Sequence, residues 1–276
     1  MAETQQAIFQ AQFSHRQPIS VNGGRVEAVF ITPVSPVEKP DIPILLAPGW
    51  SETIDVNRVP LEELYTLGRR VVTLSHARGG IHTNPDSPLP KAIDRKAASL
   101  LATLDYFGID QVDVIAHSEG GINAAVAALQ YPSRVRNMVL IGSGGLLPND
   151  NVVKLSLRFI QASIGEAMGN ISKYVISNPS WSLQETRAMA QQKSIDLLKN
   201  LQTKGIGVSF IHNVEDRVFP IGSLDKDLTV LVGQGRAGFY SVVGNHNAIL
   251  GDPRITRLAV NALDSLQYKR RKIKSR

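Results

Sequence analysis

The chain has 276 residues, contains no cysteine and carries a formal net charge of +6 at pH 7. A chain of this length can bury a large core, as one α/β domain or as a domain with an insertion, and the lack of cysteine excludes disulfides and thiolate metal sites. The positive excess comes from the last residues, 269–276, so the rest of the chain is close to neutral and no basic face for nucleic acid is predicted.

The first residues, 1–17, contain too few apolar side chains for a secretory signal. No apolar run reaches the roughly 18 residues that a membrane-spanning helix needs. We therefore expect a cytoplasmic protein without stable membrane insertion. The basic C-terminal tail, 269–276, is interpreted as a solvated helix end, and the alternative is a contact with an acidic surface.

Apolar runs alternate with helical patterns through the first half of the chain. Strands are predicted over 25–32, 42–46, 70–74, 111–117 and 135–141, and helices over 57–67, 94–107 and 121–130. Buried strands that alternate with helices are typical of an α/β fold, with a mostly parallel central sheet covered by helices on both faces.

The alternation stops between residues 148 and 205, which are predicted to be helical. There the run Ser182-Leu183-Gln184-Glu185 predicts a capping box that starts a helix ending near residue 201. Strands at 206–212 and 238–243 and a terminal helix that begins at Asp252-Pro253 complete the pattern. We therefore predict a core formed by residues 1–147 and 206–276, and a helical cap insertion at 148–205.

Ser118 lies between the predicted strand 111–117 and the predicted helix 121–130. A serine at the apex of such a strand-turn-helix presents its hydroxyl at the carboxyl edge of the sheet, against a helix N-terminus. The backbone at this apex is strained, so the residues two before and two after must be small. Ala116 and Gly120 meet that need, and Ser118 is predicted to be a nucleophile.

Two later residues are candidate partners of Ser118. Asp216 follows the predicted strand 206–212, and a carboxylate there can accept a hydrogen bond from Nδ1 of a histidine. Glu215 is the competing acid, and a turn aspartate that bonds to its own backbone is the structural alternative. His246 follows the last predicted strand and a glycine that permits a tight loop, so it is the candidate base.

The loop Pro48-Gly49-Trp50 follows the predicted strand 42–46. A tight loop there can direct a backbone N–H toward a substrate carbonyl, and the backbone N–H of Glu119 can do the same from the helix N-terminus. Trp50 and Glu119 are therefore predicted to form an oxyanion hole. The side chain of Glu119 has two open interpretations: it disfavours anionic substrates near the site, or it pairs with an arginine.

In the order nucleophile, acid and histidine, the chain resembles the α/β-hydrolase superfamily from about residue 25 to residue 266. The resemblance implies a triad of Ser118, Asp216 and His246, and an oxyanion hole from the backbones of Trp50 and Glu119. It also implies that the helical insertion is the cap that this family carries. Two departures are Ala116, where glycine is commonest, and Pro48, where many relatives carry histidine.

The expected activity is hydrolysis of a carboxylic ester through an acyl-enzyme on Ser118. An apolar acyl or aryl group is favoured, because the predicted cap offers the apolar side chains Leu155, Leu157, Phe159, Ile160 and Trp181. The alternatives are a thioester, lactone, amide or C–C bond hydrolase on the same fold, and a ligand-binding or signalling protein of low turnover that retains the triad.

No cofactor or metal is expected. The loop Gly142-Ser143-Gly144-Gly145 follows a strand but lacks the Walker and dinucleotide-binding patterns, and no histidine or carboxylate cluster has metal-ligand spacing. The expected partner is a small-molecule substrate, with no nucleic acid. Whether the protein is a monomer or a homodimer is left open by the sequence.

Overall fold

The computed structural model describes residues 2–35, 42–77, 90–147, 151–165, 175–192, 194–224, 228 and 237–274. The side chains of the predicted basic tail, 269–276, lie outside the described part, while the backbone of the last helix continues to Lys274. Among the described residues, no helix combines the length and the apolarity that crossing a membrane requires.

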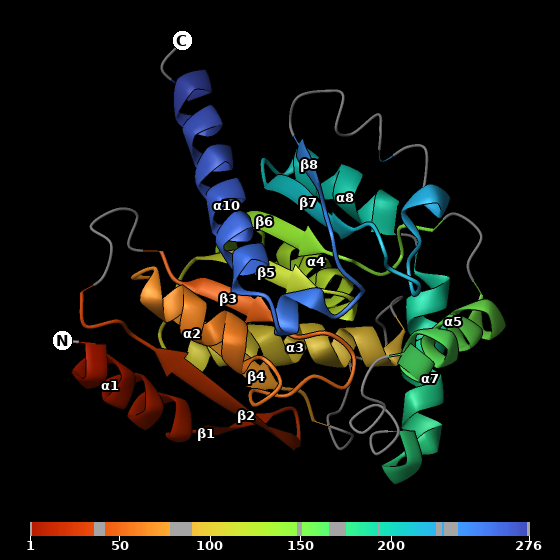
Figure 1. Cartoon of the computed structure of the whole chain (residues 1–276), viewed down its shortest axis with the longest axis horizontal. Coiled ribbons are helices and arrows are strands. Elements are labelled where there is room, and N and C mark those ends of the chain that lie inside the picture. The colour runs from red at the N-terminus through yellow and green to blue at the C-terminus, as the bar shows by residue number, and fades with distance from the viewer. Residues whose placement is uncertain are drawn as a thin grey trace.

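The described strands form a single eight-stranded sheet in the order β1-β2-β4-β3-β5-β6-β7-β8 (Figure 1). Among the described strands only β2 runs against the common direction, since it pairs antiparallel with both β1 and β4 and the remaining pairs are parallel. The strands are β1 (Gln17–Val21), β2 (Gly24–Ile31), β3 (Ile44–Ala47), β4 (Val71–Ser75), β5 (Val112–His117), β6 (Val135–Ile141), β7 (Gly207–Asn213) and β8 (Ala237–Val242).

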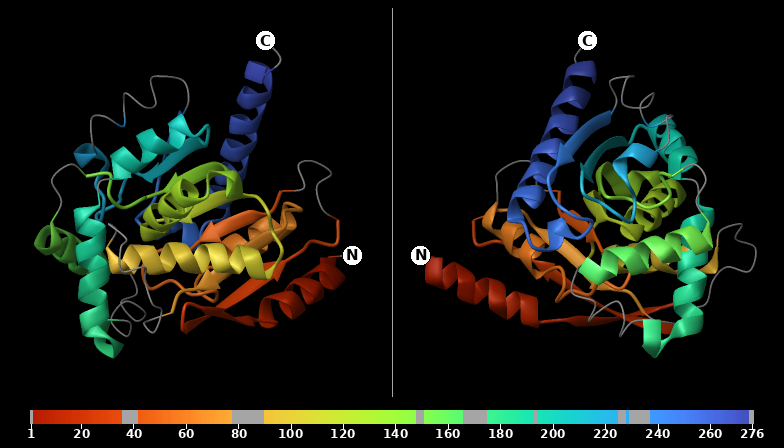
Figure 2. Two further views of the ribbon diagram at one scale, coloured as in Figure 1. Left: turned by 180° about the vertical axis from the view of Figure 1, so that it is seen from behind. Right: turned by 45° about the vertical axis from the view of Figure 1, so that its right-hand side comes forward.

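Helices cover both faces of this sheet, as the two views in Figure 2 show. They are α1 (Ala2–Ser14), α2 (Arg58–Thr66), α3 (Lys91–Tyr106), α4 (Glu119–Gln130), α5 (Val152–Gly165), α7 (Pro179–Gln191), α8 (Ser194–Thr203) and α10 (Pro253–Lys274). Short 3₁₀ turns occur at Pro132–Arg134, Ile221–Ser223 and Ala248–Leu250.

Two apolar cores result, because successive strand residues point to opposite faces. In β3, Leu45 and Ala47 belong to the core beneath α3 and α4, whereas Ile44 and Leu46 belong to the core beneath α2 and α10. Every residue of β3, β5 and β6 is buried, as expected for parallel strands covered on both faces. The predicted fold class, a mostly parallel sheet flanked by helices, is confirmed.

The first two elements, α1 and β1, were not predicted from the sequence. Helix α1 has a mostly polar sequence, and its two phenylalanines, Phe9 and Phe13, are buried in the core that α2 and α10 also cover. Strand β1 is short, contains a proline and is paired only with β2. Both elements depend on contacts with distant residues, which local patterns do not reveal.

The predicted helix from Ser182 to residue 201 was wrong, because the segment forms two helices, α7 and α8. The chain is extended at Gln192 (ψ 118°), which ends α7. The predicted capping box is also absent: the N-cap is Asn178, whose side-chain oxygen accepts a hydrogen bond from the N–H of Trp181 at 3.3 Å. The Glu185 carboxylate bonds instead to residues far along the chain.

The helices between β6 and β7 differ in their surroundings. Helix α8 packs against α4 and β7, and so belongs to a layer of the sheet. Helices α5 and α7 pack against each other, with α7 also against α3, and both lie to one side of the sheet (Figure 1). The division into a core and a cap at 148–205 stays a prediction, and α5 and α7 are its best candidates for a cap.

Candidate active site

Ser118 occupies the sharp turn between β5 and α4. Its backbone has φ 52° and ψ −122°, a strained conformation for a residue with a side chain. Three backbone hydrogen bonds hold it: its N–H donates to Ile141 O at 3.0 Å, and its carbonyl accepts from the N–H groups of Gly121 at 3.2 Å and Gly144 at 3.1 Å. Hydrogen bonds to the end of β6, to the loop after it and to the first turn of α4 therefore stabilise the strained backbone of Ser118.

The turn also requires a very small residue at position 120. A Cβ on Gly120 would lie 2.4 Å from the carbonyl oxygen of Ala47 and 2.7 Å from that of Pro48. Both atoms belong to the backbone of the loop after β3, so they cannot move aside like a flexible side chain. Gly120 thus allows the serine turn and the loop after β3 to touch.

We expect Gly120→Ala to lower the free energy of unfolding by about 1–3 kcal/mol, as for other overpacked sites. Chemical denaturation measures this change. Gly222→Ala is the matched control, since a Cβ there would have no atom within 4 Å. Equal stability of the Gly120→Ala and Gly222→Ala proteins would show that the two backbones do not need to be this close.

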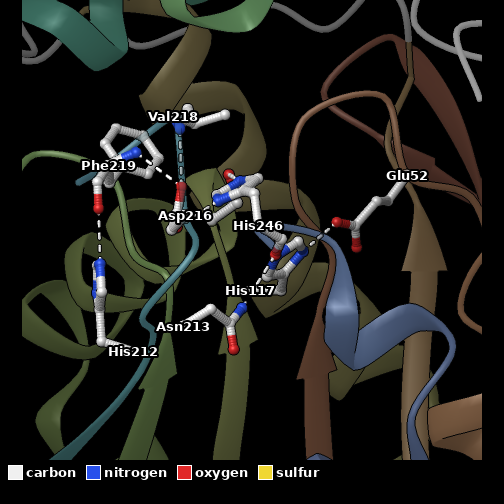
Figure 3. A network of polar contacts seen from close by, with 9 residues as sticks. Glu52, His117, His212, Asn213, Asp216, Val218, Phe219 and His246 are labelled. Atoms are coloured by element: carbon white, nitrogen blue, oxygen red, sulfur yellow. Dashed lines mark hydrogen bonds and ion pairs between the residues drawn. The ribbon is translucent and has the colours of Figure 1, made fainter. Parts of the chain in front are cut away.

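The three residues predicted as a triad lie in one hydrogen-bonded chain. Ser118 Oγ and His246 Nε2 are 2.9 Å apart, and His246 Nδ1 lies 2.8 Å from Asp216 Oδ2 (Figure 3 shows the His246–Asp216 pair). All three residues are at least 95% buried. Since the ionised Asp216 can only accept, Nδ1 of His246 carries the proton and Nε2 faces the serine hydroxyl as an acceptor.

Asp216 is held from its other oxygen as well. Its Oδ1 accepts hydrogen bonds from the backbone N–H groups of Val218 and Phe219, each at 2.8 Å (Figure 3). Burial raises the pKa of Asp216, but the charge and hydrogen bond of His246 together with the Phe219 N–H outweigh burial, so the pKa lies below its ordinary value. Glu215, the alternative acid, is exposed, and its backbone N–H donates to the carbonyl of Gly244 at 3.1 Å.

The loop after β3 lies beside the nucleophile. A Cβ on Gly49 would be 3.1 Å from Cβ of Ser118, so the backbone next to Trp50 borders the serine directly. Glu119 is the first residue of α4, where N–H groups have no partner within the helix and the helix dipole is positive. The neighbour of Trp50, Gly49, and the first residue of α4, Glu119, therefore border Ser118. The oxyanion hole of Trp50 and Glu119 stays a prediction.

A second carboxylate–histidine pair, Glu52 and His117, was missed in the sequence analysis. His117 Nδ1 bonds to Glu52, and its Nε2 donates to the carbonyl of His246 at 2.9 Å (Figure 3). Burial lowers the pKa of His117, but Glu52 and the His246 carbonyl outweigh burial and raise it above the ordinary value. His117 is the last residue of β5, and its hydrogen bond ties the backbone of His246 to the end of this strand. Its position beside Ser118 was the only signal in the sequence.

The side chain of Glu119 pairs with a lysine, not with the arginine that was one of the two expectations. Glu119 Oε2 lies 2.5 Å from Lys96 Nζ, and Lys96 also lies 2.6 Å from Glu185 Oε1. Burial raises the pKa of Glu119, the Lys96 ammonium opposes this effect and Glu185 adds to it, with a result of about 7. All three residues are almost fully buried. Lys96 was not singled out from the sequence, and Glu185 was assigned there only to the capping box.

The glycine loop after β6 supports the triad. Gly142 has φ 50°, and a Cβ there would lie 3.2 Å from Asp216 Oδ2 and 3.3 Å from His246 Nδ1. The loop therefore lets the acid and the base approach each other beside the nucleophile. Within the described ranges, no group of three or more His, Cys, Asp or Glu side chains is arranged to hold a metal ion.

Comparisons with known proteins find partial matches to two named hydrolases. The chain is 36% identical over 97 residues to 2-hydroxy-6-oxononadienedioate/2-hydroxy-6-oxononatrienedioate hydrolase 1 of Dechloromonas aromatica (strain RCB), a stretch that covers 35% of this chain and 33% of that protein. It is 30% identical over 112 residues to the serine hydrolase BPHL of Mus musculus, covering 39% of this chain and 38% of the relative. The chain thus spans little more than a third of the length of these two relatives.

Among solved structures, the bromoperoxidase of Bacillus anthracis superposes with a TM-score of 0.64 at 14% identity, covering 90% of this chain and 99% of that chain. The likeness at this identity concerns the fold. The family described as alpha/beta hydrolase fold matches residues 42–189, more than half of the chain. The protein therefore belongs to the alpha/beta hydrolase fold family.

Proposed function

We propose that the protein is a serine hydrolase that cleaves carboxylic esters through an acyl-enzyme on Ser118. The observation that carries the proposal is the chain of hydrogen bonds from Ser118 Oγ through His246 to Asp216, at 2.9 Å and 2.8 Å. A serine hydroxyl that faces an unprotonated imidazole nitrogen, with a buried carboxylate behind the ring, is an activated nucleophile.

In the proposed acylation, Ser118 Oγ attacks the carbonyl carbon while His246 Nε2 takes its proton. The backbone N–H groups of Trp50 and Glu119 receive the negative charge that develops on the carbonyl oxygen. When the tetrahedral intermediate collapses, His246 gives the proton to the departing alcohol and the acyl group stays on Ser118. In deacylation His246 takes a proton from water, whose oxygen attacks the acyl carbon, and then returns the proton to Ser118 as the carboxylic acid leaves.

An apolar acyl or aryl group remains the proposed substrate class. Three of the expected apolar side chains, Leu155, Phe159 and Trp181, are buried, and the ring of Phe159 lies 4.9 Å from that of Trp50. The other two, Leu157 and Ile160, are more than half exposed, so they do not support the proposed lining. Aromatic rings that pack beside the loop after β3 favour an uncharged, apolar group next to the scissile bond.

Hydrolysis of a C–C bond is the second candidate, because the named relative from Dechloromonas aromatica acts on dienedioates. Such substrates carry two carboxylates. The ammonium of Lys96, which pairs with Glu119 next to Ser118, already bonds to two carboxylates. The two carboxylates outweigh the single ammonium, so a further anion there would be repelled. A neutral ester is therefore favoured over a dienedioate as the substrate.

The test combines labelling with a substrate panel. We expect a fluorophosphonate to add to Ser118, as located by peptide mass mapping, and we expect turnover of p-nitrophenyl esters with apolar acyl chains to exceed turnover of a 2-hydroxy-6-oxodienedioate. Faster cleavage of the dienedioate would replace the ester proposal by the C–C candidate. A folded protein that neither labels nor turns over any ester, thioester or lactone would contradict an enzymatic role and favour ligand binding.

A further inference from the structure

Lys96, on the inner side of α3, lies deep beneath the serine turn. It is 3% exposed, and its ammonium lies 2.5 Å from Glu119 Oε2 and 2.6 Å from Glu185 Oε1. Burying an ammonium removes it from water at a cost of several kcal/mol per ion, unless close partners compensate. Replacing a buried ion pair by apolar residues is often neutral for stability. Stability alone therefore does not explain a buried lysine between two carboxylates.

The same cluster reaches the loop after β3. The second oxygen of the Glu185 carboxylate, Oε2, accepts a hydrogen bond from the indole Nε1–H of Trp50 at 2.7 Å. A continuous buried chain therefore runs from Trp50 through Glu185 and Lys96 to Glu119. Its two ends are the residues whose backbone N–H groups form the proposed oxyanion hole.

We infer that Lys96 is a positioning residue that sets the distance between the two oxyanion donors, through the chain Trp50–Glu185–Lys96–Glu119. This inference rests on the proposed function. Donors stabilise an oxyanion only when both are about 2.7–3.1 Å from it, and a misplacement of about 1 Å can lower the rate about a hundredfold. Gly120 keeps the two loops in contact, and the ion chain adds a fixed link between their side chains.

Two further titratable groups, His76 and Arg95, face the chain of ion pairs. Beside Lys96 lie two carboxylates and His76, whose pKa is lowered well below its ordinary value by burial and by Lys96. Arg95 also faces Glu185, and its guanidinium lies over the ring of Trp181, 4.1 Å from the ring centre. Glu185 belongs to α7, so its hydrogen bond to Trp50 links the segment between β6 and β7 to the loop after β3, and the ring contact of Phe159 with Trp50 adds a second link.

The first experiment replaces Lys96 by methionine, which keeps the length and apolar bulk of the side chain. Lys96→Met is expected to lower kcat for the best p-nitrophenyl ester by about 10–100-fold, somewhat less than the loss of a whole donor, with KM within about threefold. The affinity for a boronic acid analogue of the same ester, which mimics the tetrahedral intermediate on Ser118, should fall in parallel with kcat. Affinity for an ether isostere of the substrate, which has no carbonyl group, should stay unchanged.

Lys91→Met is the matched control, since Lys91 is an exposed lysine on the same helix, and wild-type kinetics are expected for it. A second variant, Trp50→Phe, keeps an aromatic ring but removes the indole donor, and should lower kcat in the same direction. Because the link is already broken in Lys96→Met, the double variant should lose little more than Lys96→Met alone.

Each outcome decides the inference. A folded Lys96→Met protein with wild-type kcat overturns the positioning role. Equal losses in kcat and in affinity for the ether isostere overturn it as well. Fully additive losses of kcat in the double variant also contradict it. If Lys96→Met does not fold, Trp50→Phe decides alone: unchanged kcat refutes the link and a fall in kcat without a change in KM supports it. An inactive, unlabelled wild-type protein would instead refute the proposed function, and the role of Lys96 with it.

Discussion

Replacing Ser118 by alanine is expected to lower kcat for the best ester by about six orders of magnitude, with the fold unchanged. The Ser118 hydroxyl bonds to His246, and the strained turn is held by backbone hydrogen bonds that alanine keeps. Removing the oxygen therefore removes the nucleophile without disturbing its surroundings. Steady-state kinetics, fluorophosphonate labelling and thermal unfolding of the variant measure the three parts of this prediction.

The matched control for labelling is Ser265→Ala, since Ser265 is an exposed serine on α10, far along the chain from the turn. It should label and turn over ester like the wild-type protein. Ester turnover by Ser118→Ala at more than a few per cent of the wild-type rate would mean that another group performs the chemistry, and the acyl-enzyme proposal would be withdrawn.

Asp216→Asn is expected to lower kcat by about four orders of magnitude while leaving the geometry intact, by analogy with the same change in other serine triads. The reason lies in the two oxygens of Asp216. Oδ1 accepts from the N–H groups of Val218 and Phe219, so an asparagine must place its own oxygen there and its NH₂ group toward His246. His246 Nδ1 then has to accept, its proton moves to Nε2, and Nε2 can no longer take the proton of Ser118.

Glu215→Gln is the control, because Glu215 is the neighbouring acid that the sequence left as an alternative, and it is exposed. It should keep wild-type kcat, and both proteins should have wild-type unfolding temperatures within a few degrees. A large loss in Glu215→Gln together with a small loss in Asp216→Asn would reverse the assignment of the acid.

Much of the fold followed from local patterns. The strands β4, β5 and β6 were predicted to within one residue at each end, because buried parallel strands form unbroken apolar runs between helical patterns. By contrast, the predicted capping box at Ser182 failed, since a serine and a glutamate three residues apart also suit a helix interior. The Glu185 carboxylate instead bonds to Trp50 and Lys96. These residues come close to Glu185 only through tertiary packing, such as that of α7 against α3.

The amino-acid sequence alone determined which residue types stand at the ends of the strands: a serine after β5, an acid after β7 and a histidine after β8. Because the carboxyl ends of parallel strands share one edge of a sheet, that order was enough to predict which side chains meet. Only the tertiary structure decided how they are held. Contacts between residues far apart in the chain, such as Glu52 with His117 and Lys96 with Glu119 and Glu185, depend on how helices pack onto the sheet, and no local pattern encodes that packing.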